Sequence, residues 1–357
     1  MTEPEEDVVE RDWWIYRGTG SVPESGPAPF PEPPPWRTYD GAPPEGTGWA
    51  TPPTPAEASR QRRLGRFSRG GSPVKLDPKM LDIVNSALLL RRPLLITGKA
   101  GTGKSTLAYS IATELDLGAV LYWPITSRST LGDGLYQYDA IGRLQALSRA
   151  NLATTAGQGE PANEETGVGR FLRLGPLGSA LIPWQRPRVL LIDEIDKSDV
   201  DLPNDLLTIF EEAEFVITEL ARLADQPTAQ VRLHDGSVTT VERGLVRCLQ
   251  FPVVVLTSNG ERDFPPAFLR RCIRLTMPQP DEQRLRDIVE AHLGADQLEA
   301  AVPHIHDFLA KLNQGDDLAA DQLLNAVFLA SGGQNNPHAT EEAVREALRP
   351  LNRPVDD

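Results

Sequence analysis

Residues 93–106 carry the residue types and the spacing of a phosphate site. The sequence PLLITGKAGTGKST contains Gly98-x-x-x-x-Gly103-Lys104-Ser105, which is the P-loop spacing. Glycines let the main chain approach phosphate oxygens without Cβ clashes, so backbone N–H groups can hold them. Lys104 would lie against the β- and γ-phosphates, and the Ser105 hydroxyl would ligate magnesium. The residues expected around the phosphates are Gly98, Lys99, Ala100, Gly101, Thr102, Gly103, Lys104, Ser105 and Thr106.

The elements on either side of these glycines fit the same chemistry. Residues 94–96 are apolar and predict a buried strand, and residues 104–115 predict a helix. The glycines therefore lie where a strand turns into a helix N-terminus, whose dipole favours an anion. The alternative is a glycine-rich turn with an accidental Lys-Ser pair, and it does not account for a strand and a helix in the required places.

Two adjacent carboxylates form a second candidate site. Residues 188–197 read RVLLIDEIDK, in which four apolar residues precede Asp193 and Glu194. If a buried parallel strand ends beside a P-loop, Asp193 can hold the magnesium shell and Glu194 can polarise an attacking water. The string is weak evidence by itself, and its position after a P-loop is what gives it weight.

Further candidates follow the next apolar strand, 251–256. Asn259 would face the crevice at the carboxyl ends of the strands and could orient the water, although an asparagine there is usually a turn former. Arg270 and Arg271 precede a short strand. In a ring, such a guanidinium could reach a neighbouring subunit's site; the residues alone favour the alternative of a surface salt-bridge pair.

The composition limits the classes of function. The chain has 357 residues, a net charge of −14 and a pI near 4.9, which argues against a surface that follows a nucleic-acid backbone. No stretch reaches a membrane-spanning length, and the first residues are acidic rather than basic before an apolar run. We expect a cytoplasmic protein without membrane contact, whose Cys248 and Cys272 are reduced and buried.

Three regions are expected along the chain: an extended Pro/Gly/Trp-rich tail at 1–72, an α/β core at 73–278 and a helical domain at 279–357. The tail holds four of the six tryptophans, Trp13, Trp14, Trp36 and Trp49, so it either docks on a neighbouring surface or stays disordered. Its basic run at 60–69 reads as a solvated linker, with an acidic partner patch as the alternative.

Within the core and the helical domain, the pattern predicts some elements by their residue ranges. In the core we expect a helix from 78, a strand at 119–125, a loop at 131–138, a helix at 199–212 and a β-hairpin at 230–241. In the C-terminal domain we expect helices at 281–292, 297–313, 321–331 and 340–348.

Taken together, the strings GKAGTGKST, LLIDEIDK, VVLTSN and FPPAFLRR resemble the AAA+ ATPases over residues 73–350. The LGDGLYQY and GPLGSAL segments and the hairpin are similar to the MoxR-type subgroup, bacterial ATPases regarded as chaperones that act beside von Willebrand factor A partners. The resemblance implies a P-loop NTPase fold, with a five-stranded parallel sheet, helices on both faces and a helical lid. It also implies a ring, commonly a hexamer, that uses ATP and Mg²⁺.

The resemblance also assigns roles to residues of this chain. It gives Lys104 and Ser105 to the phosphate loop, Asp193 and Glu194 to the magnesium and catalytic carboxylates, and Asn259 to the first sensor. Arg271, or failing that Arg270, becomes the arginine acting in trans, which now ranks above the salt-bridge alternative. One departure is that many relatives carry a basic second sensor where this chain has Ala320-Asp321-Gln322.

The expected function is ATP hydrolysis by a ring that remodels or activates a partner protein, such as a von Willebrand factor A-domain protein. Two alternatives stay open. One is a nucleotide-gated scaffold with little turnover, in keeping with the missing basic second sensor. The other is a nucleic-acid-linked NTPase motor, which the acidic composition disfavours. The sequence does not separate ATP from GTP.

Overall fold

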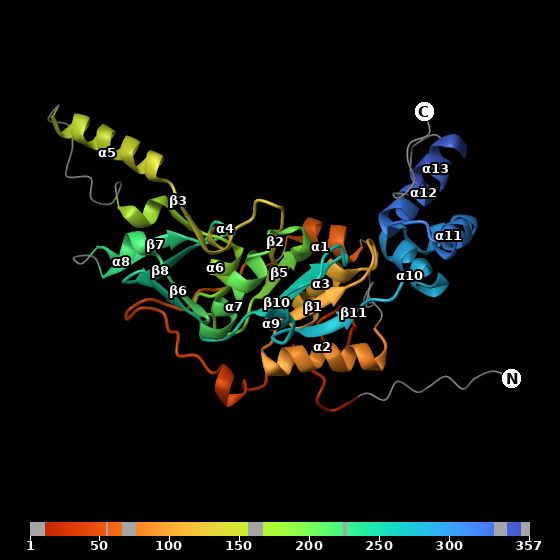
Figure 1. Cartoon of the computed structure of the whole chain (residues 1–357), viewed down its shortest axis with the longest axis horizontal. Coiled ribbons are helices and arrows are strands. Elements are labelled where there is room, and N and C mark those ends of the chain that lie inside the picture. Colours follow the sequence, from red (N-terminus) through yellow and green to blue (C-terminus); the bar gives the residue numbers. More distant parts are fainter. Residues whose placement is uncertain are drawn as a thin grey trace.

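The computed structural model describes residues 11–54, 56–65, 76–155, 167–223, 227–331 and 341–350. At its centre is a five-stranded sheet in which every neighbouring pair is parallel and the order is β11-β1-β10-β5-β2 (Figure 1). This confirms the predicted P-loop NTPase fold of the AAA+ type. The strands of this first sheet are β1 (Leu94–Thr97), β2 (Leu121–Pro124), β5 (Val189–Asp193), β10 (Val253–Ser258) and β11 (Ile273–Thr276).

Burial explains why these segments are strands. All six residues of β10 are buried, as are the first four of β5, and such continuous apolar runs suit strands that are covered on both faces. Helices cover the two faces, and two separate clusters of buried side chains lie on either side of the sheet. The helices are α2 (Pro78–Leu90), α3 (Lys104–Glu114), α7 (Leu202–Glu212) and α9 (Pro266–Leu269), with the 3₁₀ turn η3 (Ile195–Lys197) after β5.

A second sheet of six short strands extends from the first, in the order β3-β4-β7-β8-β9-β6. It contains the predicted hairpin, as β7 and β8 with Asp235 and Gly236 in the turn. The strands are β3 (Tyr136–Tyr138), β4 (Leu172–Leu174), β6 (Glu214–Val216), β7 (Thr228–Arg232), β8 (Val238–Glu242) and β9 (Leu245–Arg247). The accompanying helices are α4 (Leu131–Leu135), α5 (Ala140–Thr155), η2 (Val168–Phe171), α6 (Pro176–Ala180) and α8 (Thr218–Ala221).

The prediction of a loop at 131–138 is wrong. Thr130 accepts a hydrogen bond from the backbone N–H of Asp133, and the Asp133 side chain accepts from the N–H of Thr130, which is a capping box that starts α4. The next residues pair as β3 with β4. Two glycines in LGDG suggested a loop, but Gly134 is buried against the Trp123 ring, where a side chain would not fit.

The C-terminal helices form the lid expected from the sequence. They enclose their own cluster of buried residues and lie at one end of the first sheet (Figure 1). The predicted helix at 340–348 begins at a residue outside the described part. The lid elements are α10 (Glu282–Leu293), η4 (Ala295–Gln297), α11 (Leu298–Asn313), α12 (Ala320–Ser331) and α13 (Glu341–Ala347). Over the described ranges, no helix combines the length and apolar character needed to cross a membrane.

The N-terminal segment is extended from 11 to 54, with one 3₁₀ turn, η1 (Pro35–Arg37), and it then forms α1 (Glu57–Leu64). Figure 1 shows it in red, passing beneath α2. Trp14 is docked on the core, which was one of the two alternatives: its side chain is buried and donates its indole N–H to Asp82. Trp36, in contrast, is 77% exposed. The proposed boundary at 72–73 lies outside the described residues.

Polar side chains of the core hold this segment. Asn85, buried on α2, accepts the backbone N–H groups of Ile15 and Tyr16 through Oδ1 and donates Nδ2 to the Tyr16 carbonyl. Glu114, buried at the end of α3, accepts the N–H groups of Thr19 and Gly20 at 2.7 and 3.1 Å. An extended segment has no backbone partners of its own, so these side chains supply the hydrogen bonds that docking requires.

We expect Asn85→Ala to destabilise the protein. The change removes the acceptor of the Ile15 and Tyr16 backbone N–H groups, and an unsatisfied buried polar group costs about 1–3 kcal/mol. Denaturant unfolding measures the loss. The control is Asn204→Ala on the exposed side of α7, which should change little. Equal midpoints for the two variants would show that these hydrogen bonds do not hold the segment.

Candidate active site

The P-loop residues form a tight turn between β1 and α3 that has no room for side chains at Gly98 and Gly101. Gly98 has φ of 152° and Gly101 has φ of 74°, both in the region that favours glycine. A Cβ on Gly98 would lie 2.8 Å from the Met277 carbonyl oxygen, and one on Gly101 would lie 2.4 Å from the Ala320 backbone nitrogen in the lid. The lid therefore packs directly on the loop, and both glycines are required by the space around them.

Lys104 begins α3 and turns its side chain back along the loop. Its Nζ donates to the carbonyl oxygens of Gly98 and Lys99, both at 2.7 Å, and to Asn259 Oδ1 at 2.8 Å. Burial lowers the pKa of the ammonium group, and the charges of nearby carboxylates, Asp193 foremost, oppose this shift. Lys104 is on the cavity wall, and phosphate oxygens could replace these carbonyl partners.

Asp193, the last residue of β5, is held by three hydroxyl groups. Its Oδ1 accepts from Ser105 Oγ and from Thr257 Oγ1, both at 2.6 Å, and its Oδ2 accepts from the Tyr122 hydroxyl at 3.3 Å. The Ser105 hydroxyl and the Asp193 carboxylate are hard oxygen donors placed beside the P-loop, which is the ligand set that Mg²⁺ uses next to phosphates. These residues fit a magnesium ion.

Glu194 projects its carboxylate past the end of β5. Its backbone is left-handed, with φ of 60°, a strained conformation for a residue with a side chain. Its N–H donates to Thr257 Oγ1 at 2.9 Å. The carboxylate is 42% exposed, pairs with Lys197 at 2.9 Å and lies 3.5 Å from Asn259 Nδ2. Within the cavity it is therefore accessible to water and close to an amide that can orient one.

Asp196 places Asn259 and is a residue that the sequence reasoning missed. It is buried, and its Oδ2 accepts the backbone N–H groups of Asn259 at 2.9 Å and Glu261 at 3.1 Å. The chain after β10 is thereby tied to the turn after β5. A third carboxylate, two residues beyond Glu194, was the only signal in the sequence, and Thr257 was likewise visible only as part of the string TSN.

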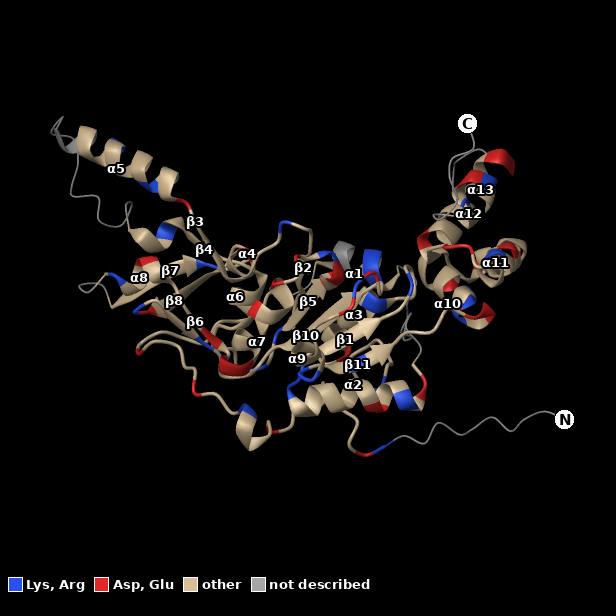
Figure 2. Cartoon of the chain, viewed as in Figure 1, with Lys and Arg blue, Asp and Glu red and all other residues tan. Residues whose placement is uncertain are grey.

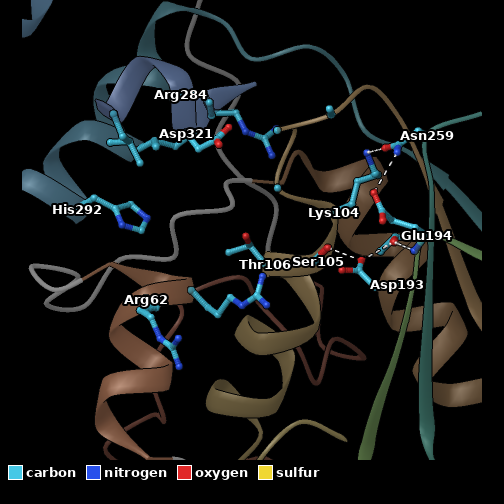
Figure 3. Close-up of a pocket in the computed structure, with 18 residues that line it drawn as sticks. Arg62, Lys104, Ser105, Thr106, Asp193, Glu194, Asn259, Arg284, His292 and Asp321 are labelled. Atoms are coloured by element: carbon cyan, nitrogen blue, oxygen red, sulfur yellow. Dashed lines mark hydrogen bonds between the residues drawn. The ribbon is translucent and has the colours of Figure 1, made fainter. Parts of the chain in front are cut away.

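The site opens into a cavity of about 380 Å³ between the first sheet, the lid and α1. Figure 3 shows Lys104, Asp193, Glu194 and Asn259 on one side and Arg284 and Asp321 of the lid on another. Arg284 is a third residue that the sequence did not point to, and it donates to the Thr102 carbonyl at 2.8 Å. Of the predicted phosphate residues, those on the cavity wall are Ala100, Gly101, Gly103, Lys104, Ser105 and Thr106; Gly98, Lys99 and Thr102 are not among the residues that line it.

Arg270 and Arg271 are not on the wall of this cavity. Arg271 Nε pairs with Glu211 of α7 at 2.7 Å, and the Arg270 carbonyl accepts a hydrogen bond from Arg92. Within one chain, Arg271 thus forms the surface ion pair that was the alternative interpretation. Its position is outside the site of its own chain, and a role in trans stays a prediction.

One protein family matches the part of the chain that carries these residues. A family model described as the AAA domain, dynein-related subfamily, matches residues 93–272, from the residue before β1 to the residue before β11. The chain belongs to this AAA family. The matched span contains the P-loop, Asp193, Glu194, Asn259 and both arginines, and the family supports nucleotide binding and ATPase-type chemistry. No curated protein matches the chain.

We expect Asp196→Ala to slow nucleotide hydrolysis while leaving nucleotide affinity nearly unchanged. Without its carboxylate, the Asn259 backbone loses its anchor, and a displacement of about 1 Å at a catalytic group can cost on the order of 100-fold in rate. Steady-state kinetics and equilibrium binding separate the two effects. Asp199→Ala, an exposed carboxylate nearby, is the matched control. Wild-type turnover in Asp196→Ala would refute the positioning role.

Proposed function

We propose that this protein hydrolyses ATP at the cavity between the first sheet and the lid. The observation that carries the proposal is the hydrogen bond of 2.6 Å between Ser105 of the P-loop and Asp193, with Glu194 next to it. A phosphate chain on the loop would therefore meet the magnesium ligands and a water-accessible carboxylate at one place. The cavity volume of about 380 Å³ is within the range of small-molecule sites.

In the proposed mechanism Lys104, Glu194 and Asn259 act from the positions that they occupy in the structure. Lys104 exchanges its carbonyl partners for phosphate oxygens and stabilises the charge that develops on them. Glu194 accepts a proton from a water that Asn259 helps to orient, and the water attacks the terminal phosphorus in line with the leaving oxygen. Mg²⁺ on Ser105 and Asp193 would supply charge neutralisation at the phosphates.

Two substitutions test this proposal. Lys104→Ala should weaken nucleotide binding, because the cation facing the phosphates is removed. Glu194→Gln should bind nucleotide like the wild type and lose turnover by about 100-fold or more, because the amide cannot accept the proton. Binding is measured with a fluorescent nucleotide and turnover by phosphate release, for both ATP and GTP. Glu212→Gln, exposed at the end of α7, serves as the control.

The outcomes separate the proposal from the scaffold alternative. Normal phosphate release from Glu194→Gln would refute the role given to Glu194. Tight binding and nucleotide-dependent assembly with negligible wild-type turnover would instead favour the nucleotide-gated scaffold. Asp321 lies on the cavity wall where a basic second sensor is found in many relatives, and this carboxylate keeps that alternative open.

We further propose that the protein acts as a ring, commonly six subunits, of the MoxR type, and remodels a client such as a von Willebrand factor A-domain protein. Support comes from the resemblance of the sequence and from the position of Arg271, which is outside its own chain's cavity and available to a neighbour's if Glu211 releases it. The net charge of −14 disfavours a nucleic-acid motor, and filter binding at low salt distinguishes that alternative.

A mixing experiment tests Arg271 in trans. Arg271→Ala and Glu194→Gln should each be nearly inactive alone. Mixed subunits should regain activity above the sum of the two, because a pocket with an intact Glu194 then meets a neighbour with an intact Arg271. Arg274→Ala, an exposed arginine on β11, is the control. Absence of any gain on mixing, with assembly intact, would contradict the role; the same experiment with Arg270→Ala tests the second candidate.

A further inference from the structure

The N-terminal helix α1 joins the sheet domain to the lid at the edge of the cavity. Leu64 at its end is buried, and the next residue, Gly65, has φ of 93°. A Cβ on Gly65 would lie 2.4 Å from the Ala291 carbonyl oxygen of α10, so the helix end fits closely against the lid. On its other side, α1 packs against α3. Part of the basic run at 60–69 is therefore helical and docked rather than a solvated linker.

Arg62 and Arg63 of α1 are on the wall of the same cavity as Ser105 and Thr106. Figure 2 shows the basic residues of α1 as blue bands beside α3, and Figure 3 shows Arg62 on its helix across the cavity from Arg284. Both α1 side chains are exposed.

The other cations of the wall are engaged by the protein itself. Lys104 donates to the carbonyl oxygens of Gly98 and Lys99, and Arg284 donates to that of Thr102. The guanidinium groups of Arg62 and Arg63 are exposed on the wall, so a ligand in the cavity can reach them.

Arg63 is oriented by two aromatic rings. Its guanidinium carbon lies 5.3 Å from the centre of the Tyr109 ring and 5.4 Å from that of Tyr122. A stacked guanidinium keeps N–H groups at its edge for hydrogen bonds, and this planar donor suits phosphate oxygens. The Tyr122 hydroxyl in turn donates to Asp193. Tyr122 thus connects Arg63 to Asp193, the proposed magnesium ligand.

We propose that Arg63, assisted by Arg62, binds the phosphate chain of the nucleotide from the N-terminal segment of the same chain. Because α1 contacts both α3 and α10, nucleotide binding then stabilises the docked position of α1 between the sheet and the lid. Coupling of this kind is reciprocal, so displacing α1 weakens nucleotide binding by the same factor. The inference rests on the proposed nucleotide site and not on hydrolysis.

The first test measures affinities of the full chain for ATP, ADP and adenosine. Arg63→Met removes the charge and should weaken ATP and ADP binding by about tenfold, with adenosine unaffected. Arg63→Lys keeps the charge but lacks the planar guanidinium, so its affinity for ATP and ADP should lie between those of the wild type and Arg63→Met. The control is Arg149→Met on the exposed side of α5. Unchanged affinity for ATP and ADP, or an equal loss for adenosine, would overturn the phosphate contact.

The second test displaces α1 while keeping both arginines. Gly65→Ala places a Cβ against the Ala291 backbone and should reduce ATP affinity in the same direction as Arg63→Met. The double variant should bind ATP no more weakly than the weaker-binding single variant, because both changes remove the same contact between Arg63 and the phosphates. Additive losses in the free energy of ATP binding would overturn the coupling. Unfolding without nucleotide checks that each variant is folded.

Limited trypsin digestion gives a readout that is independent of turnover. Cleavage after Arg62 or Arg63, followed by mass spectrometry, should be slowed by ATP in Glu194→Gln and not in Lys104→Ala. Cleavage at the same rate with and without ATP in the Glu194→Gln protein would contradict the stabilised docking. If the wild type binds ATP but does not hydrolyse it, the proposed turnover fails while these binding and protection tests still decide the role of Arg63.

Discussion

The hydrogen bond between Ser105 and Asp193 joins residues 88 positions apart, and it brings the two halves of the candidate site together. It exists because β1, β10 and β5 are adjacent and parallel, so the chain leaves all three at the same edge of the sheet. The P-loop follows β1, and Asn259 follows β10. Asp193 is the last residue of β5, and Glu194 comes directly after it. The apolar burial of these strands is therefore what brings polar groups together at the cavity.

The sequence allowed the local parts of this site to be predicted. The glycine spacing required a turn, the apolar runs required strands, and Asp193 and Glu194 stood at the end of one of them. The resemblance implied a five-stranded parallel sheet but the order of its strands was not predicted, since pairing between distant segments leaves no local signal. Asp196, Thr257 and Arg284 were missed for the same reason: their hydrogen bonds reach residues far along the chain.

Short elements and the docked N-terminal segment were harder to predict. Strands of three residues such as β3, β4 and β9 are too short to show alternation, so most of the second sheet was not foreseen. The N-terminal segment looked unable to form a core because it has few aliphatic residues. It docks because Asn85 and Glu114 supply partners for its backbone, and side chains on another element cannot be inferred from its own composition.

The two cysteines, Cys248 and Cys272, are free and buried, and burial raises the pKa of each thiol to about 12. The reactive thiolate form is therefore disfavoured at neutral pH. Alkylating dyes should therefore not react with Cys248 or Cys272 in the folded protein. Single cysteines introduced on α1 and on the lid would accept a fluorophore pair without removal of the native thiols, so distances across the cavity are open to spectroscopy in the otherwise unaltered chain.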